Sequence, residues 1–209
     1  RFKTSRLQKL IKHEVSVPVD ETALANDRNA ILERYRNAGH FGVEVTTTQT
    51  PVDAGGVNVT FVIQEQPRYK LKRVEFYGNK EFSDDELRAA IVTKREWWRY
   101  IFRFGNYFNE QQLILDRDKL KEVYGAKGHL DFTITEIEKT FDEKQKWVTL
   151  TFKMIEGPQY SITDITVTGA KLFTPEYLLG KIKSAPGATY NSSLEALDTN
   201  VMKAEYERL

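Results

Sequence analysis

The chain has 209 residues, 40% of them hydrophobic and 29% charged, a composition typical of a globular protein with one large or a few small domains. Its formal net charge of +1 argues against a dedicated nucleic-acid surface, because such a surface needs a clear basic excess. The absence of cysteine excludes disulfides, thiolate metal sites and a cysteine nucleophile, and no apolar run approaches the ~18–20 residues of a membrane span.

Several stretches of the sequence repeat one another. The stretch VEFYGNKEF at 74–82 returns as ITVTGAKLF at 165–173, with glycine, lysine and phenylalanine at the same places. The stretch DRNAILERYRNAGHFGV from Asp27 returns from Asp116 as DRDKLKEVYGAKGHLDF. A partial third register aligns three further pairs: Phe2 with Phe173, Asp27 with Asp198, and Tyr35 with Tyr206. Self-similarity at a fixed spacing predicts tandem structural units.

The repeat predicts three units along the chain. Residues 1–67 form a unit that lacks its first strand, residues 68–157 form a complete unit, and residues 158–209 form a unit that ends within its second helix. Both ends of the sequence therefore look like cuts in a longer chain.

The complete unit begins with a strand and a short helix. The stretch LKRVEFY at 71–77 alternates polar and apolar residues, which predicts a strand, and Gly78 marks the turn after it. Ser83 and Glu86 have the spacing of a capping box, which predicts a helix start. An apolar stripe on this helix comprises Leu87, Ala90 and Ile91.

A second helix and two strands complete the unit. Asn109 caps the helix and Gly128 ends it, while Leu113, Leu120 and Tyr124 form its apolar face. Strands are predicted at 130–137 and 147–155, with the polar segment 138–146 as the hairpin connection. The order β-α-α-β-β predicts an α+β fold, in which two helices cover one face of a three-stranded mixed sheet.

The connections between units are short. EQPRY at 65–69 and EGPQY at 156–160 each contain a proline, which fixes φ and leaves little slack. We expect an elongated array of modules with limited hinge freedom.

This pattern resembles the POTRA (polypeptide-transport-associated) domain, and the tandem units are similar to the periplasmic arm of the BamA-like outer-membrane β-barrel assembly factor family. The alignment of the three repeated units covers nearly the whole chain. The resemblance implies a binding and scaffolding role in the periplasm, without enzymatic activity, metal or cofactor. The implied partners are unfolded outer-membrane proteins, accessory lipoproteins of an assembly complex, and the protein's own C-terminal membrane barrel, which is absent here; no nucleic acid is expected.

The family resemblance also implies where partners bind. POTRA sheets expose the edge of their second strand, and an unpaired backbone edge can accept an added strand with little regard to sequence. The edges are predicted at 41–48 and 130–137, and the alternative is that these strands only complete their sheets. The candidate partner-binding residues are Phe41, Val43, Val45, Thr47, Leu130, Phe132, Ile134 and Glu136.

The middle unit carries a tryptophan-rich insertion at about 93–107, similar to that of one internal POTRA domain of the family. This segment either packs on its own unit or contacts a partner or the membrane surface, since aromatic and basic residues suit a membrane interface. It is too short and too charged to span a bilayer. The candidate interface residues are Trp97, Trp98, Arg99, Tyr100, Phe102 and Arg103.

The repeated histidines and aspartates have structural interpretations. His40 and His129 follow the second helix of their units, where a polarisable side chain suits the helix C-terminus. Asp27, Asp116 and Asp198 are expected to pair with arginine on the helix surface. Two alternatives to a BamA-like assembly arm remain open. One is the POTRA arm of a two-partner secretion transporter or another relative of the family, and the other is an enzyme on a helix-plus-sheet scaffold.

Overall fold

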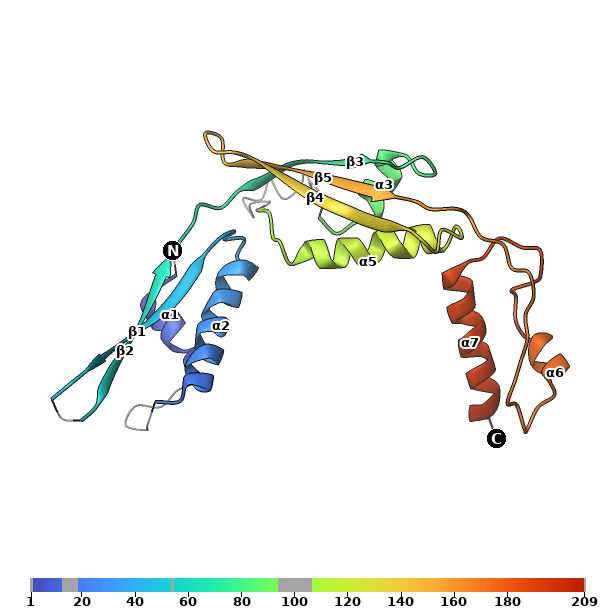
Figure 1. Cartoon of the computed structure of the whole chain (residues 1–209), viewed down its shortest axis with the longest axis horizontal. Coiled ribbons are helices and arrows are strands. Elements are labelled where there is room, and N and C mark those ends of the chain that lie inside the picture. The colour runs from blue at the N-terminus through green and yellow to red at the C-terminus, as the bar shows by residue number, and fades with distance from the viewer. Residues whose placement is uncertain (1, 13–18, 54, 94–106, 209) are drawn as a thin grey trace. The chain divides into compact units, whose positions relative to one another are not determined.

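The computed structural model describes residues 2–12, 19–53, 55–93 and 107–208 (Figure 1). These residues divide into two compact units. The first comprises the described residues within 1–73, 95–113 and 140–149, and the second comprises those within 74–94, 114–139 and 150–209.

The N-terminal part of the chain contains two helices and a β-hairpin. The helices are α1 (Thr4–Gln8) and α2 (Glu21–Asn37), and the antiparallel strands are β1 (Glu44–Pro51) and β2 (Val57–Gln64). Asp20 caps α2 by accepting the N–H of Thr22 at 2.8 Å. The buried core of this part comprises Leu7, Ile31, Tyr35, Val43 and Val45.

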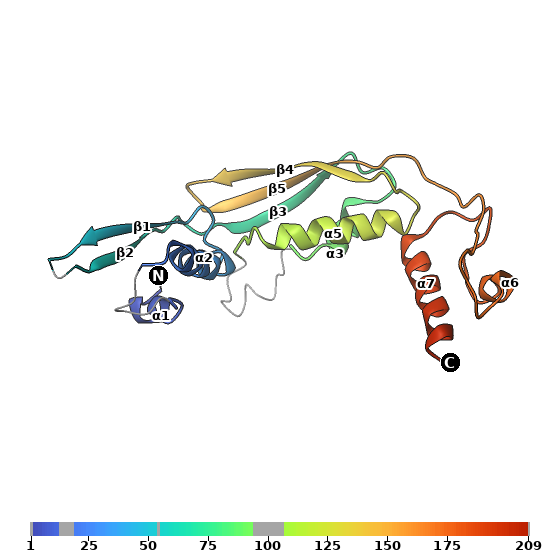
Figure 2. The same cartoon turned by 60° about the horizontal axis from the view of Figure 1, so that its bottom comes forward.

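The middle part contains the predicted β-α-α-β-β order. Its elements are β3 (Lys70–Tyr77), α3 (Asp84–Ala90), α5 (Gln112–Gly125), β4 (Thr133–Asp142) and β5 (Trp147–Ile155). The strand order is β3-β5-β4, and Figure 2 shows β3 and β5 running in one direction, β4 in the other, and both helices on one face. The α+β class with a mixed three-stranded sheet is therefore confirmed.

Local sequence signals explain these elements. Ser83 and Glu86 form the predicted capping box at the start of α3, with both reciprocal hydrogen bonds present. Alternate residues of β5 are buried and face the helices, as expected for a sheet with one covered face. These residues are Val148, Leu150, Phe152 and Met154.

The hairpin between β4 and β5 is tighter than the sequence predicts. β4 starts at Thr133 and continues to Asp142, so most of the predicted connection 138–146 belongs to a strand. The Asp142 carboxylate accepts the N–H groups of Lys144 and Gln145 at 3.1 and 3.0 Å, which closes the turn locally. The polar composition of 138–146 therefore led to a wrong prediction of a long connection. Side-chain hydrogen bonds of Asp142 allow these charged residues to form a compact turn.

The C-terminal part contains two helices, α6 (Pro175–Leu179) and α7 (Ser192–Glu207), capped by Thr174 and Asn191. The stretch at 162–168, which repeats β3 in sequence, forms no strand, and one isolated bridge joins Ser161 to Thr189. β3 is held by its pairing with β5, whereas no described strand pairs with 162–168. Without a neighbouring strand there is no ladder of backbone hydrogen bonds to hold this stretch as a strand.

Candidate strand-binding edges

Strand β4 lies at one end of the three-stranded sheet. It pairs with β5 on one side, and no described strand pairs with its other side. An edge of this kind presents backbone N–H and C=O groups that can pair with an extended segment of another chain. The β4 edge is therefore a candidate binding site.

The regular alternation of β4 is interrupted near its start. Ile134 and Ile137 are half-buried, whereas Thr135 and Glu136 between them are both exposed. The Thr135 hydroxyl donates to the carbonyl of Lys153 on β5 at 3.1 Å, a contact between a side chain and the backbone. Two consecutive exposed residues and this contact are typical of a β-bulge.

The solvent-facing side of β4 carries two carboxylates. The Lys153 ammonium on β5 donates to Glu136 and to Glu138, at 2.9 Å each. These two hydrogen bonds, that to Glu136 first, raise the pKa of Lys153 above its ordinary value. Two carboxylates and one ammonium leave this site with a formal charge of −1 at neutral pH.

The opposite edge strand, β3, is contacted by neighbouring groups at its middle and just before its start. The Arg88 guanidinium on α3 donates to the carbonyl of Val74 at 3.1 Å, and Asp84 and Asp85 hold the guanidinium in place. Near the start of β3, the carbonyl of Tyr69 accepts a backbone N–H from the segment before α5, at 2.8 Å. The two edges therefore differ: neighbouring groups occupy β3, and the outer side of β4 has no described strand beside it.

Strand β1 is the second predicted edge. It pairs with β2 in continuous register from Glu44 opposite Gln64 to Pro51 opposite Val57, without a bulge. Its solvent-facing side is mostly threonine, at positions 46, 48 and 50. This edge is neutral over most of its length.

The predicted edge residues do not all lie in strands. Phe41 and Val43 precede β1, and Leu130 and Phe132 precede β4, because each strand begins later than the sequence predicts. The remaining four lie inside the strands: Val45, Thr47, Ile134 and Glu136.

The early residues have packing roles. Phe132 is buried and stacks on Tyr124 with ring centroids 4.1 Å apart, and Val43 belongs to the core around α2. Leu130, in contrast, is 47% exposed. The candidate insertion residues Trp97, Trp98, Arg99, Tyr100, Phe102 and Arg103 lie outside the described residues.

The three repeated aspartates are buried, so their predicted position on the helix surface is wrong. Their side chains accept backbone N–H groups from the segment before the second helix of each repeat. The pairs are Asp27 with Lys12, Asp116 with Val92 and Thr93, and Asp198 with Lys183 and Ser184. Burial opposes ionisation of Asp198, but the hydrogen bonds outweigh it and lower its pKa. These carboxylates fasten the connection between the two helices.

A first joint links β2 to the start of β3, within the first compact unit. The Tyr35 hydroxyl donates to the Glu65 carboxylate at 2.7 Å, and His40 Nδ1 lies 3.2 Å from the Gln66 carbonyl. Since a carbonyl only accepts, His40 Nδ1 carries the proton. Phe41 stacks on Phe141 at 5.0 Å between ring centroids, which adds an aromatic contact from the β4–β5 hairpin.

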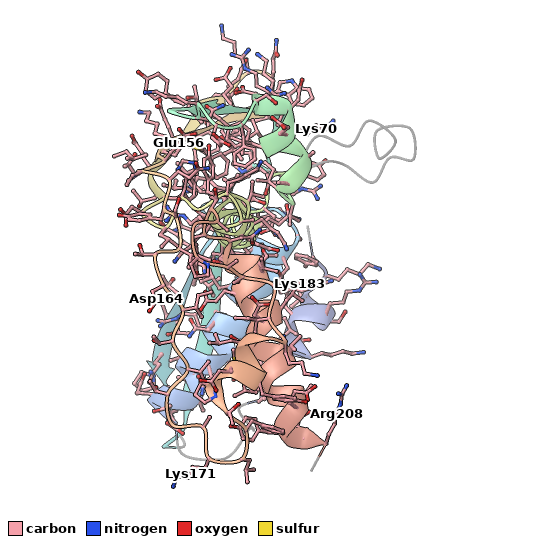
Figure 3. The ribbon with its side chains drawn as sticks, turned by 90° about the vertical axis from the view of Figure 1, so that its right-hand side faces the viewer. Lys70, Glu156, Asp164, Lys171, Lys183 and Arg208 are labelled. Carbon is pink, nitrogen blue, oxygen red and sulfur yellow. The ribbon has the colours of Figure 1, made fainter. Side chains whose placement is uncertain are left out.

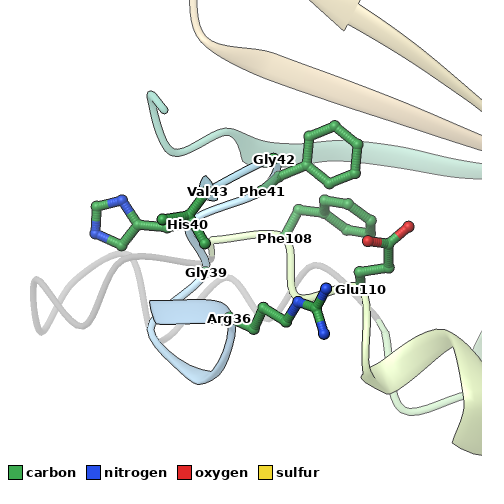
Figure 4. A pocket seen from close by; sticks show the side chains of 8 residues that line it. All are labelled: Arg36, Gly39, His40, Phe41, Gly42, Val43, Phe108 and Glu110. Atoms are coloured by element: carbon green, nitrogen blue, oxygen red, sulfur yellow. The ribbon is translucent and has the colours of Figure 1, made fainter. Parts of the chain in front are cut away.

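A cavity of about 250 Å³ opens beside the first joint (Figure 4). The rings of Phe41 and Phe108 form its apolar side, with centroids 6.0 Å apart. Arg36 and Glu110 contribute its charged side chains. The cavity shows that the aromatic packing of this joint is not continuous.

A second joint, within the second compact unit, repeats the hydrogen bonds of the first. The Tyr124 hydroxyl donates to Glu156 at 3.0 Å, and His129 Nδ1 lies 3.1 Å from the Gly157 carbonyl. Glu156, labelled in Figure 3, also accepts the N–H groups of Lys80 and Glu81 at 2.7 and 2.9 Å. Burial opposes its ionisation, but the hydrogen bonds, including that of Tyr124, lower its pKa. Sequence reasoning located both connections but missed these hydrogen bonds, although the repeated tyrosine, histidine and glutamate were visible.

Among the described residues there is no group of three or more His, Asp or Glu side chains placed to hold a metal ion. No helix in the described ranges combines the length and apolarity needed to cross a membrane.

Comparisons with known proteins identify the family. The family model of POTRA, described as surface antigen variable number repeat, matches residues 1–66 and 69–157. An outer membrane protein assembly factor of Treponema pallidum is 30% identical over 82% of this chain and 20% of its own length. BamA of Neorickettsia risticii is 25% identical over 88% of this chain, and BamA of Neisseria meningitidis is 27% identical over 77%.

Solved structures agree in fold. The structure of Haemophilus influenzae BamA POTRA3-5 covers 98% of this chain, which covers 80% of that structure, with a TM-score of 0.63 and 18% identity. BamA of Haemophilus ducreyi lacking POTRA domains 1-3 covers 72% of this chain, which covers 26% of that structure, with a TM-score of 0.52 and 17% identity.

The chain spans about a fifth to a quarter of the length of the curated relatives it matches. The match of the family model extends over more than half of the chain. The chain therefore belongs to the POTRA family and consists of tandem POTRA domains of the BamA-like kind.

Proposed function

We propose that this chain is part of the periplasmic arm of an outer-membrane assembly factor, where it binds unfolded β-barrel precursors and accessory lipoproteins. Its modules would be residues 1–67, 68–157 and 158–209, with the insertion at about 93–107 contacting a partner or the membrane surface. The role is binding and scaffolding, and no bond is made or broken. The similarity to BamA proteins supports this proposal.

The observation that carries the proposal is the difference between the two edges of the middle sheet. The guanidinium of Arg88 and the segment before α5 occupy the β3 edge, whereas β4 has no described strand on its outer side. Main-chain pairing at an open edge tolerates many sequences, which suits a protein with many clients. β1 is a second candidate edge of the same type.

The test is amide chemical-shift mapping with an extended peptide of alternating apolar and polar residues. We expect perturbed amides in Thr133–Lys139, in Glu44–Pro51, or in both. Perturbations confined to other segments, such as the covered β3, would contradict the proposal.

Backbone N-methylation of the peptide provides the matched control. Alternate N–H groups of an added strand face the protein, so methyl groups at one set of alternate positions should abolish binding. Methyl groups at the other set should leave it largely intact. Equal effects of the two sets would show that binding does not depend on main-chain pairing.

A further inference from the structure

We infer that the β4 edge selects extended segments that carry basic side chains on their solvent-facing side. This inference rests on the proposed strand addition and specifies its client. Side chains of an added strand alternate between the two faces of the sheet, so each lies beside β4 side chains of the same face. The charges along β4 therefore determine which side chains are favourable in the added strand.

The charged side chains on the solvent-facing side of the β4 edge are accessible to solvent. Their summed formal charge is negative. The side chains of Glu136 and Glu138 are 57% and 48% exposed, and that of Lys153 between them is 38% exposed. One ammonium cannot neutralise both carboxylates. A lysine or arginine of an added strand would supply the missing charge, whereas an acidic residue there would be repelled.

The helix-facing side of the same edge is apolar at Ile134 and Ile137, and the half-buried Lys139 follows on that side. Ile134 and Ile137 are half-buried and lie beside the covered face of the sheet. Apolar residues of an added strand would extend this covered face. The favoured occupant therefore alternates basic and apolar residues beside the segment from Thr133 to Glu138.

The same charges disfavour a second copy of this chain at the edge. Pairing two β4 edges would bring Glu136 and Glu138 of one copy close to the same residues of the other, and like charges across strands are destabilising. The neutral β1 edge has no comparable preference, since threonines occupy most of its solvent-facing positions. The occupant we propose for β4 is thus an extended segment of a different polypeptide.

The experiment titrates the chain with three peptides that share apolar residues at alternate positions. The other positions are all lysine, all serine or all glutamate. We expect the lysine peptide to bind the β4 edge about 3- to 10-fold more tightly than the serine peptide, since each exposed ion pair contributes about 1.4- to 5-fold. The glutamate peptide should bind more weakly than either, and 1 M salt should reduce the differences.

Charge reversal of the edge tests the assignment. The double variant Glu136→Lys with Glu138→Lys should reverse the order of the lysine and glutamate peptides. Glu122→Lys, a matched reversal of an exposed glutamate on α5, should not change it. Lys153→Gln leaves both carboxylates without their ammonium and should strengthen binding of the lysine peptide about 2-fold.

The outcomes separate this inference from the proposed function. Equal affinity of the three peptides, with β4 amides perturbed by each, would refute the charge preference and retain strand addition. A preference that survives the double reversal would also refute it, because the selecting charges would lie elsewhere. Failure of every peptide to perturb β4 would refute strand addition at this edge.

Discussion

The two joints share their hydrogen bonds and differ in what surrounds them. Each has a tyrosine donating to a glutamate, a histidine beside a carbonyl, and a glycine at positive φ. Aromatic rings, Phe41 on Phe141, reinforce the first joint, whereas at the equivalent place in the second Leu130 is 47% exposed. The comparison separates a repeated core of contacts from an aromatic addition specific to one joint.

Methyl groups at the two glycines should have the largest effects. A Cβ at Gly128 would lie 2.9 Å from the Tyr160 oxygen and 3.0 Å from the Tyr190 oxygen, and at Gly39 it would lie 2.9 Å from Tyr107 Cβ. Because backbone atoms cannot move aside easily, Gly128→Ala should reduce local stability by about 3–4 kcal/mol, and Gly39→Ala by about 2–3 kcal/mol.

Two equivalent amides report on these joints. The N–H of Phe108 donates to the Tyr69 carbonyl in the first joint, and the N–H of Tyr190 donates to the Tyr160 carbonyl in the second. Their hydrogen-exchange rates measure local opening directly. Gly169→Ala is the control, since Gly169 has φ +77° and nothing within 4 Å of a Cβ. An equal effect at Gly169 would show that backbone strain alone, rather than close packing, explains the losses.

Truncation of the aromatic contact should distinguish the joints. Phe41→Ala removes the ring that contacts Phe141 and Phe108, which we expect to cost about 1.5–3 kcal/mol. Leu130→Ala should cost less than about 1 kcal/mol because Leu130 is already half exposed. Exchange at the Phe108 and Tyr190 amides checks both. Similar costs for the two truncations would refute the difference between the joints.

Neutralising the glutamate of either joint should have a smaller effect, and here the second joint should lose more stability than the first. Glu156 accepts two backbone N–H groups in addition to the tyrosine hydroxyl, so Glu156→Gln should cost about 1–2 kcal/mol. Glu65→Gln should cost about 0.5–1 kcal/mol through its bond with Tyr35. Chemical denaturation followed at the same amides provides the measurement, and a larger loss for Glu65→Gln would contradict this order.

Lowering the pH should weaken the second joint, and this effect should be smaller than those of the substitutions. The folded-state pKa of Glu156 lies below its ordinary value of 4.5, so its ionised form stabilises the fold above that pH. This contribution is lost as the pH falls through the lowered pKa. The aromatic contact between Phe41 and Phe141 in the first joint does not change with pH, because these rings do not titrate. Exchange at the Tyr190 amide, measured from pH 6 downward, should therefore show extra opening that Glu156→Gln abolishes.

The repeated periodicities predicted the fold because they report which side chains share a face. The capping box at Ser83 and the alternation of Val148 to Met154 act over a few residues, so one sequence suffices to read them. The burial of Asp116 was not predictable in this way, because its partners, the N–H groups of Val92 and Thr93, lie in a separate segment. An exposed helical aspartate and a buried one look the same in sequence.

The site was less predictable than the fold for a related reason. The sequence placed the edges near the correct strands but started both too early, since Phe41 and Phe132 have the apolar character of strand residues. Their packing against Phe141 and Tyr124 depends on tertiary contacts. The consecutive exposure of Thr135 and Glu136, with the hydrogen bond from Thr135 to Lys153 of β5, likewise involves the partner strand.

The contact of Arg88 with the Val74 carbonyl has a consequence for stoichiometry. A sheet with two open edges could accept a chain on each side and join two clients through one module. If Arg88 keeps the β3 edge from pairing, the proposed strand addition would give the middle sheet a valency of one. A client that needs several points of attachment would then have to engage successive modules, and their number would limit how many segments are held at once.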